Sequence, residues 1–159
     1  MNGLAPEQLH LLLQSAIQAP SADNKHPIRF QLGDQCILVH HARTEWGERG
    51  YKRVLALLSL GALAENLAIA ASRFGIGTDF VLLPEPSQPS LVLRINLLPD
   101  SAQTDALWQA IPLRHTSRHI LFRGPPLDAD NFAQLDASIR PHPDANYIGL
   151  TKLLDANKP

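Results

Sequence analysis

Two arginines four residues apart form the segment of this sequence best suited to binding an anion. Arg114 and Arg118 enclose two hydroxyl side chains, Thr116 and Ser117. Guanidinium groups donate charge-assisted hydrogen bonds to phosphate oxygens, and neighbouring hydroxyls add further donors. The spacing therefore predicts a phosphate-binding segment. A solvated basic turn after a helix is the alternative interpretation, and composition alone leaves both open.

A polar loop is predicted near the N-terminus, where residues 19–30 lie between a helical pattern and a strand pattern. It contains Pro20, Ser21, Asp23 and Asn24. Ser, Asp and Asn side chains satisfy nearby backbone groups and leave other donors free, so such a loop can face a polar ligand. Loops of this composition are also commonly structural only, and the residues by themselves do not decide between the two roles.

Several other kinds of site are not indicated. His40, His41, His115 and His119 are not spaced with carboxylates as metal ligands would be, and adjacent strand residues point to opposite faces. We therefore expect no metal. The sequence contains neither a glycine-rich dinucleotide fingerprint nor a P-loop, and no serine is flanked as in a nucleophile elbow. We predict no catalytic side chain.

The overall composition is that of a single folded domain of moderate size. The chain has 159 residues, of which 45% are hydrophobic, and a formal net charge of -1. No global positive field therefore draws it to nucleic acid or to an anionic membrane. The single cysteine, Cys36, lies in an apolar run and is predicted to be buried. We recognise no signal peptide and no uninterrupted apolar run of ~18 residues, so we expect a cytoplasmic protein.

Hydrophobic periodicity and turn residues predict alternating helices and strands around the two candidate segments. The expected elements, in order, are a helix over residues 4–18, a hairpin of strands over 28–32 and 35–41, a long helix over 51–74, strands over 78–83 and 91–98, a short helix over 101–111 capped by Ser101 or Thr104 and ended by Pro112, and a capped helix over 128–139.

The long helix over residues 51–74 is apolar around more than half of its circumference. Small residues between Gly61 and Ala71 allow another helix to approach closely. A dimer interface and an ordinary core helix inside a monomer both explain this pattern, and periodicity does not choose between them. Gly75 and Gly77 are expected to end the helix in the left-handed region.

Three motifs, taken together and in this order, resemble the FMN-dependent nitroreductase family. They are the Pro-Ser-Ala-Asp-Asn loop at 20–24, the small-residue helix at 61–71 followed by Gly75, and Arg-His-Thr-Ser-Arg at 114–118. The first motif is moderately specific, and the other two gain weight from their order. The similarity covers nearly the whole chain. It is closest to the long subgroup, in which two nitroreductase-like halves follow one another in one chain.

The resemblance implies an α+β fold, in which a mixed or antiparallel sheet packs against helices and one long helix is central. Family members form dimers through long helices, and FMN lies in the dimer interface, or between the two halves in the long subgroup. The family's Pro-Ser-x-x-Asn loop approaches the flavin from the partner half. This implies flavin contacts for Pro20, Ser21 and Asn24.

The family's arginine segment grips the FMN phosphate and ribityl chain. By resemblance, this role falls to Arg114, Ser117 and Arg118, with Thr116 as a helper. The family's late Lys or Arg phosphate contacts have no evident counterpart here.

The order of the motifs departs from that of single-half members, in which the arginine segment precedes the Pro-Ser loop. Here it follows the loop. A shift of 122 residues places Leu13 on Leu135, Ile17 on Ile139 and Asn24 on Asn146, which is a weak internal match. We therefore expect residues 1–111 to form a nitroreductase-like half and residues 112–159 to carry the arginine segment and the beginning of a second, incomplete half. A complete flavin site would then need a second chain or half-domain.

The function that the resemblance implies is electron transfer from NADH or NADPH through FMN to a nitro, quinone or similar small-molecule acceptor. Since the flavin carries the redox chemistry, this function requires no side-chain nucleophile. The incomplete motif set leaves two alternatives open. Instead of an enzyme, the chain would then be a non-catalytic relative that binds or sequesters flavin, or an interaction module that has lost flavin.

Overall fold

The structure is a computed structural model of the 159-residue chain, and it describes residues 4–21, 24–25, 27–42, 50–116 and 127–140. The chain divides into two compact units, Met1–Ser117 and Arg118–Pro159. Within the described part of the second unit, the helix α3 (Ala129–Ile139) is the regular element. Asp128 caps it, because its Oδ1 accepts a hydrogen bond from the Asn131 amide at 2.7 Å. The predicted helix over 128–139 is therefore confirmed.

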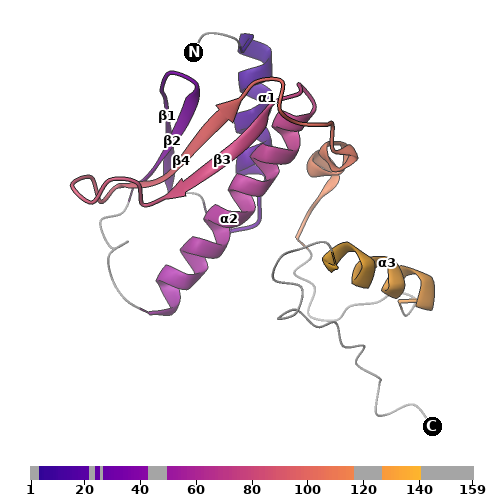
Figure 1. The fold of residues 1–159 in the computed structure, drawn as a ribbon. Helices are drawn as coiled ribbons and strands as arrows, with labels where there is room; N and C mark the ends of the chain where they lie inside the picture. Colours follow the sequence, from indigo (N-terminus) through magenta and orange to yellow (C-terminus); the bar gives the residue numbers. More distant parts are fainter. Residues whose placement is uncertain (1–3, 22–23, 26, 43–49, 117–126, 141–159) are drawn as a thin grey trace. The chain divides into compact units, whose positions relative to one another are not determined.

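The first unit combines two α-helices with a four-stranded sheet (Figure 1). In chain order its regular elements are α1 (Pro6–Ile17), β1 (Ile28–Leu32), β2 (Cys36–His41), α2 (Tyr51–Ser72), β3 (Gly77–Leu82), β4 (Leu91–Leu98), and the short 3-10 helices η3 (Ala106–Gln109) and η4 (Ile111–Leu113). The predicted helix, hairpin, long helix and two later strands are all present, and the α+β class is confirmed.

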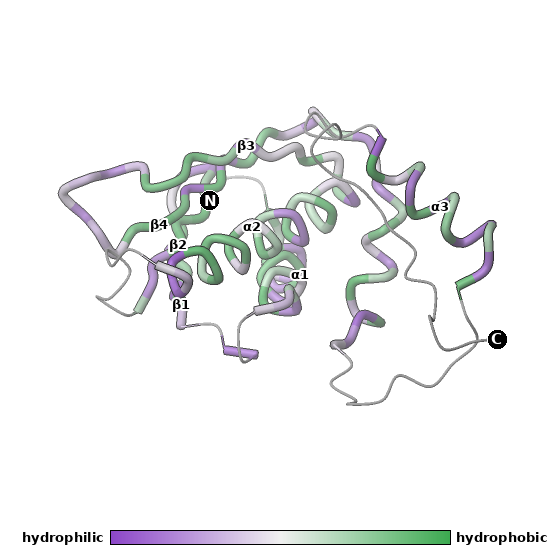
Figure 2. Tube along the Cα trace, turned by 90° about the horizontal axis from the view of Figure 1, so that it is seen from below, coloured by the Kyte–Doolittle hydropathy of each residue, from purple (hydrophilic) through white to green (hydrophobic). Residues whose placement is uncertain are grey.

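The sheet is entirely antiparallel, in the order β1-β2-β4-β3. The β1–β2 hairpin pairs Phe30 with Val39, and β2 continues onto β4, where Ile37 pairs with Ile95. The helices α1 and α2 lie on the same face of the sheet (Figure 2). Side chains along β4 show the consequence, since Leu93, Ile95 and Leu97 are buried while Arg94 is exposed.

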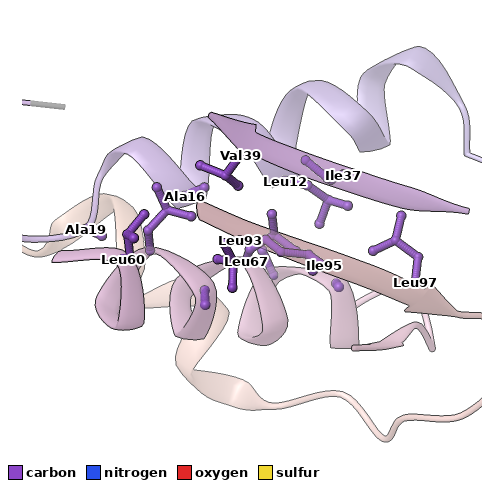
Figure 3. Close-up of a cluster of buried hydrophobic side chains, with 14 of the residues drawn as sticks. Leu12, Ala16, Ala19, Ile37, Val39, Leu60, Leu67, Leu93, Ile95 and Leu97 are labelled. Atoms are coloured by element: carbon purple, nitrogen blue, oxygen red, sulfur yellow. The ribbon is translucent and has the colours of Figure 1, made fainter. Parts of the chain in front are cut away.

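The core fills the space between the two helices and this sheet face (Figure 3). Leu12 of α1, Leu67 of α2 and Ile95 of β4 are each fully buried. Cys36 is also buried, as predicted. Two small residues, Ala16 of α1 and Ala70 of α2, are also fully buried in this core.

The two ends of α2 differ in burial. From Leu60 onward the helix supplies Leu60, Leu63 and Leu67 to the core, whereas its first two turns leave large apolar side chains exposed. By length and composition alone, α2 is the one helix among the described residues that could cross a membrane. A core helix of a folded protein has the same length and composition.

The segment between β4 and residue 114 differs from the prediction. Instead of one helix over residues 101–111, the chain forms η3 and η4, and the cap of η3 is Asp105, whose Oδ1 accepts from the Leu107 amide at 2.8 Å. Pro112 does not end this region but lies inside η4, because proline is tolerated in a first helical turn. Ser101 instead accepts a hydrogen bond from the Gly77 amide. Gly75 has φ 72°, which confirms one of the two left-handed glycines expected after the long helix, whereas Gly77 is the first residue of β3 and does not have a positive φ.

Candidate functional site

The C-terminal end of α1 anchors the candidate site, because side chains from two distant parts of the chain bind its last carbonyl groups. A helix leaves its final carbonyls without partners inside the helix, and α1 has no C-terminal glycine to cap them. Asn66 of α2 donates from Nδ2 to the Ser15 carbonyl at 3.0 Å. Arg114, which follows η4, donates to the Gln18 carbonyl. Three separate elements therefore meet just before Pro20.

Arg114 commits three of its donors inside the protein. Its Nε and Nη2 both donate to the Gln18 carbonyl, at 3.2 and 2.6 Å, and its Nη1 donates to Thr116 Oγ1 at 3.1 Å. A guanidinium has five N–H donors, two of them on each terminal nitrogen. One N–H of Nη1 and one of Nη2 therefore remain. Because Arg114 and Thr116 are both exposed, an anion in solvent can reach this remaining edge.

In the described part of the polar loop that follows α1, one buried side-chain group is unsatisfied. Ser21 Oγ is buried and has no hydrogen-bond partner among the described residues. The Ser21 carbonyl accepts from the Asn24 amide at 3.2 Å, and Asn24 has φ 55°. Asparagine is one of the few non-glycine residues that tolerate this left-handed conformation. An unpaired buried hydroxyl costs about 1–3 kcal/mol, so a ligand with a polar atom at Ser21 Oγ would be stabilised there.

The structure brings the two predicted segments to one place within a single chain. Arg114 binds the carbonyl of Gln18, two residues before Pro20, although 96 positions separate Arg114 and Gln18 in the sequence. The predicted site residues Pro20, Ser21, Asn24, Arg114 and Thr116 therefore belong to one region of the first unit. The other two predicted residues, at 117 and 118, lie outside the described residues.

Sequence reasoning missed two contributors to this region, the Gln18 carbonyl and Asn66. A signal for both was present. A helix that stops before a proline without a capping glycine needs donors for its last carbonyls, and Asn66 is one of the few polar residues in the mostly apolar second half of α2. What the sequence did not contain is which distant side chain supplies each donor.

Other polar groups do not form a competing site in the described part of the chain. No three His, Cys, Asp or Glu residues lie close enough there to hold a metal ion. His40 Nδ1 lies 3.4 Å from Ser90 Oγ, and His40 Nε2 is buried without a partner. Among these residues no carboxylate contacts His40, so the pair lacks the orienting acid of a Ser-His-Asp arrangement.

Comparison with known proteins shows a relationship at the level of structure. No protein-family model and no curated protein sequence matches the chain. A solved structure of a protein assigned as a nitroreductase, in complex with FMN, from Desulfovibrio desulfuricans is similar, with a TM-score of 0.51 and 20% identity over 78% of this chain and 87% of that chain.

Two further nitroreductase family proteins are similar in part. The protein from Clostridium novyi NT has a TM-score of 0.49 and 15% identity over 62% of this chain and 77% of its own. The protein from Streptococcus pneumoniae TIGR4 has a TM-score of 0.45 and 17% identity over 79% of this chain and 88% of its own. The likeness to the Desulfovibrio structure shows that this chain has a nitroreductase-like α+β fold.

Proposed function

We propose that this protein is an FMN-dependent oxidoreductase of the nitroreductase type. It would take electrons from NADH or NADPH and pass them to a nitro, quinone or similar planar acceptor, and its expected location is the cytoplasm. The observation that carries the proposal is the meeting of the 114–116 segment with the polar loop at the end of α1, on a nitroreductase-like fold. When bound, the flavin supplies the redox chemistry, and the protein supplies binding and orientation.

The described residues fit the two ends of an FMN molecule. The Ser21 hydroxyl has no partner among the described residues and can hydrogen-bond to a polar edge of the flavin ring, with Pro20 and Asn24 bordering it. The free edge of the Arg114 guanidinium suits a phosphate, with Thr116 beside it. Ser117 and Arg118 would add to the phosphate contacts, as the resemblance to the family implies.

A homodimer would provide the second wall of this site, and α2 offers a self-complementary surface for it. The first turns of α2 expose Tyr51, Val54, Leu55 and Leu58, which recur at helical spacing on one face. The same face continues over Gly61, which has open space around it, to the exposed Glu65. Large apolar residues thus occupy one end of the stripe and small or polar residues the other.

In an antiparallel pair of α2 helices with its twofold axis at Leu58, the apolar end of each stripe would face the small or polar end of the other. Leu55 would then pack over Gly61 of the partner subunit, and the Tyr51 hydroxyl would face the partner's Glu65 carboxylate. A twofold interface requires this reciprocity, because each residue pair occurs twice. We propose this pairing as the route to a complete site.

Leu58→Glu tests the dimer, because it places two like charges at the axis. Sedimentation or size-exclusion chromatography should show a dimer for the wild type and a monomer for the variant. The matched control is Leu107→Glu on η3, since Leu107 is 59% exposed and Leu58 is 65% exposed. A wild-type monomer, or dissociation by both substitutions, would reject the α2 interface.

A second nitroreductase-like half is the other source of a second wall, and we propose that residues 112–159 correspond to its beginning. The shift of 122 residues carries Pro6–Ile17 of α1 onto positions 128–139, where α3 spans Ala129–Ile139. The mass of the protein isolated from its natural source separates the two arrangements. A polypeptide chain with a mass well above 17.5 kDa favours the long form, and a chain of 17.5 kDa favours the homodimer.

Anaerobic addition of NADH or NADPH to the FMN-loaded protein tests the enzymatic function. We expect the visible flavin absorbance to bleach and to return when a nitroarene or quinone is added. Stoichiometric flavin that neither nucleotide reduces would indicate a sequestering protein instead. A stable dimer without flavin would indicate an interaction module.

A further inference from the structure

Arg114 makes contacts that suit a different role from that of a phosphate ligand alone. A side chain that serves only to attract an anion needs no internal partner. Arg114 instead directs two N–H groups, on Nε and Nη2, at one backbone carbonyl, that of Gln18. Thr116 Oγ1 accepts from the third nitrogen and fixes the plane of the guanidinium. Lysine cannot reproduce this planar arrangement, because its three donors all lie on one nitrogen.

The carbonyl that Arg114 binds controls the start of the polar loop. Gln18 is the C-terminal cap of α1, and its carbonyl has no partner within the helix. The Ala19 amide still donates to Ala16, so Gln18 joins the end of the helix to the loop that begins at Pro20. Holding the Gln18 carbonyl therefore fixes the direction in which Pro20 and Ser21 leave the helix.

We propose that Arg114 is a positioning residue, which clamps the polar loop against the 114–116 segment through the Gln18 carbonyl. The clamp exists without any ligand. Its effect on flavin rests on the proposed function, and it predicts a particular pattern. Loss of the clamp should weaken the binding of every ligand that contacts the loop, whether or not the ligand carries a phosphate.

Arg114→Lys separates the clamp from the phosphate contact, because it keeps the positive charge and removes the two-donor arrangement. FMN and riboflavin share the flavin ring and differ in the phosphate. Arg114→Lys should lower the affinity for FMN and for riboflavin by a similar factor, about tenfold. Flavin fluorescence titration measures both affinities. Arg94→Lys, on the exposed face of β4, is the matched control and should change neither. A loss confined to FMN would make Arg114 a phosphate ligand and overturn the clamp.

Amide hydrogen exchange tests the clamp without flavin. The Ala19 and Asn24 amides, which donate to Ala16 and Ser21, should exchange about tenfold faster in Arg114→Lys. The Leu9 amide, near the start of α1, should not change. If exchange responds but neither flavin binds, the clamp stands and the proposed function fails. Unchanged exchange at both amides overturns the clamp whatever the flavin result.

A second variant covers the outcome in which Arg114→Lys does not fold. Thr116→Val removes only the acceptor that fixes Nη1, so it should give the same pattern at smaller size. Faster exchange at the Asn24 amide would support the clamp, and unchanged exchange there would refute it.

Discussion

Asn66 provides the sharpest test of how the base of the candidate site is held together. Its Nδ2 donates to the Ser15 carbonyl across the α1–α2 contact, in partly buried surroundings. Asn66→Ala leaves this carbonyl unpaired, at a cost of about 1–3 kcal/mol. Alanine also has a better helix propensity than asparagine, and this difference offsets up to ~0.7 kcal/mol of the lost stability. The net loss in unfolding free energy should therefore be about 0.3–2.3 kcal/mol.

Urea denaturation followed by circular dichroism measures this loss, with Asn96→Ala as the matched control. Asn96 also donates from Nδ2, but to the Asp79 carboxylate at 3.2 Å and at an exposed position. Its loss should cost less than about 0.5 kcal/mol, because water replaces the partner. Equal losses for the two variants, or none for Asn66→Ala, would show that the Ser15 carbonyl does not depend on Asn66.

Two further stability predictions concern the scaffold behind the site. Leu67→Ala should lower the unfolding free energy by about 2–5 kcal/mol, because Leu67 is fully buried between α1, α2 and the sheet; a loss below about 1 kcal/mol in urea denaturation would contradict this core. Gly75→Ala should cost about 1–2 kcal/mol, because φ 72° places its Cβ in the left-handed region; an unchanged midpoint in the same experiment would argue against this helix end.

The regular elements of the first unit follow closely from local patterns. The spacing of Leu9, Leu12 and Ala16 predicts α1, and alternation with turn residues predicts the β1–β2 hairpin. The 3-10 helices after β4 were not predictable from local patterns, because a 3-10 helix has too few residues for a clear period. The cap of η3, Asp105, also competes with several other potential capping residues. Local sequence also holds no information on strand order, so the central place of β4 required the structure.

The candidate site was predictable as residue types but not as an arrangement. The composition of the loop and of the arginine segment marked Ser21 and Arg114 as polar groups with spare donors. Their proximity depends on a hydrogen bond between residues 96 positions apart, and no local pattern encodes such a contact. The resemblance to nitroreductases placed the loop against a partner half. The structure adds a hydrogen bond from Arg114 of the same unit to the Gln18 carbonyl, directly before the loop.

Binding of FMN to the purified protein is the measurement that tests the central claim most directly. We predict a shift of the visible flavin spectrum and thermal stabilisation, which corresponds to about 2.7 kcal/mol when FMN is at 100 times its dissociation constant. Arg118→Ala should weaken FMN binding and leave riboflavin binding unchanged. If saturating FMN changes neither the spectrum nor the melting temperature, the flavin site does not exist in this protein.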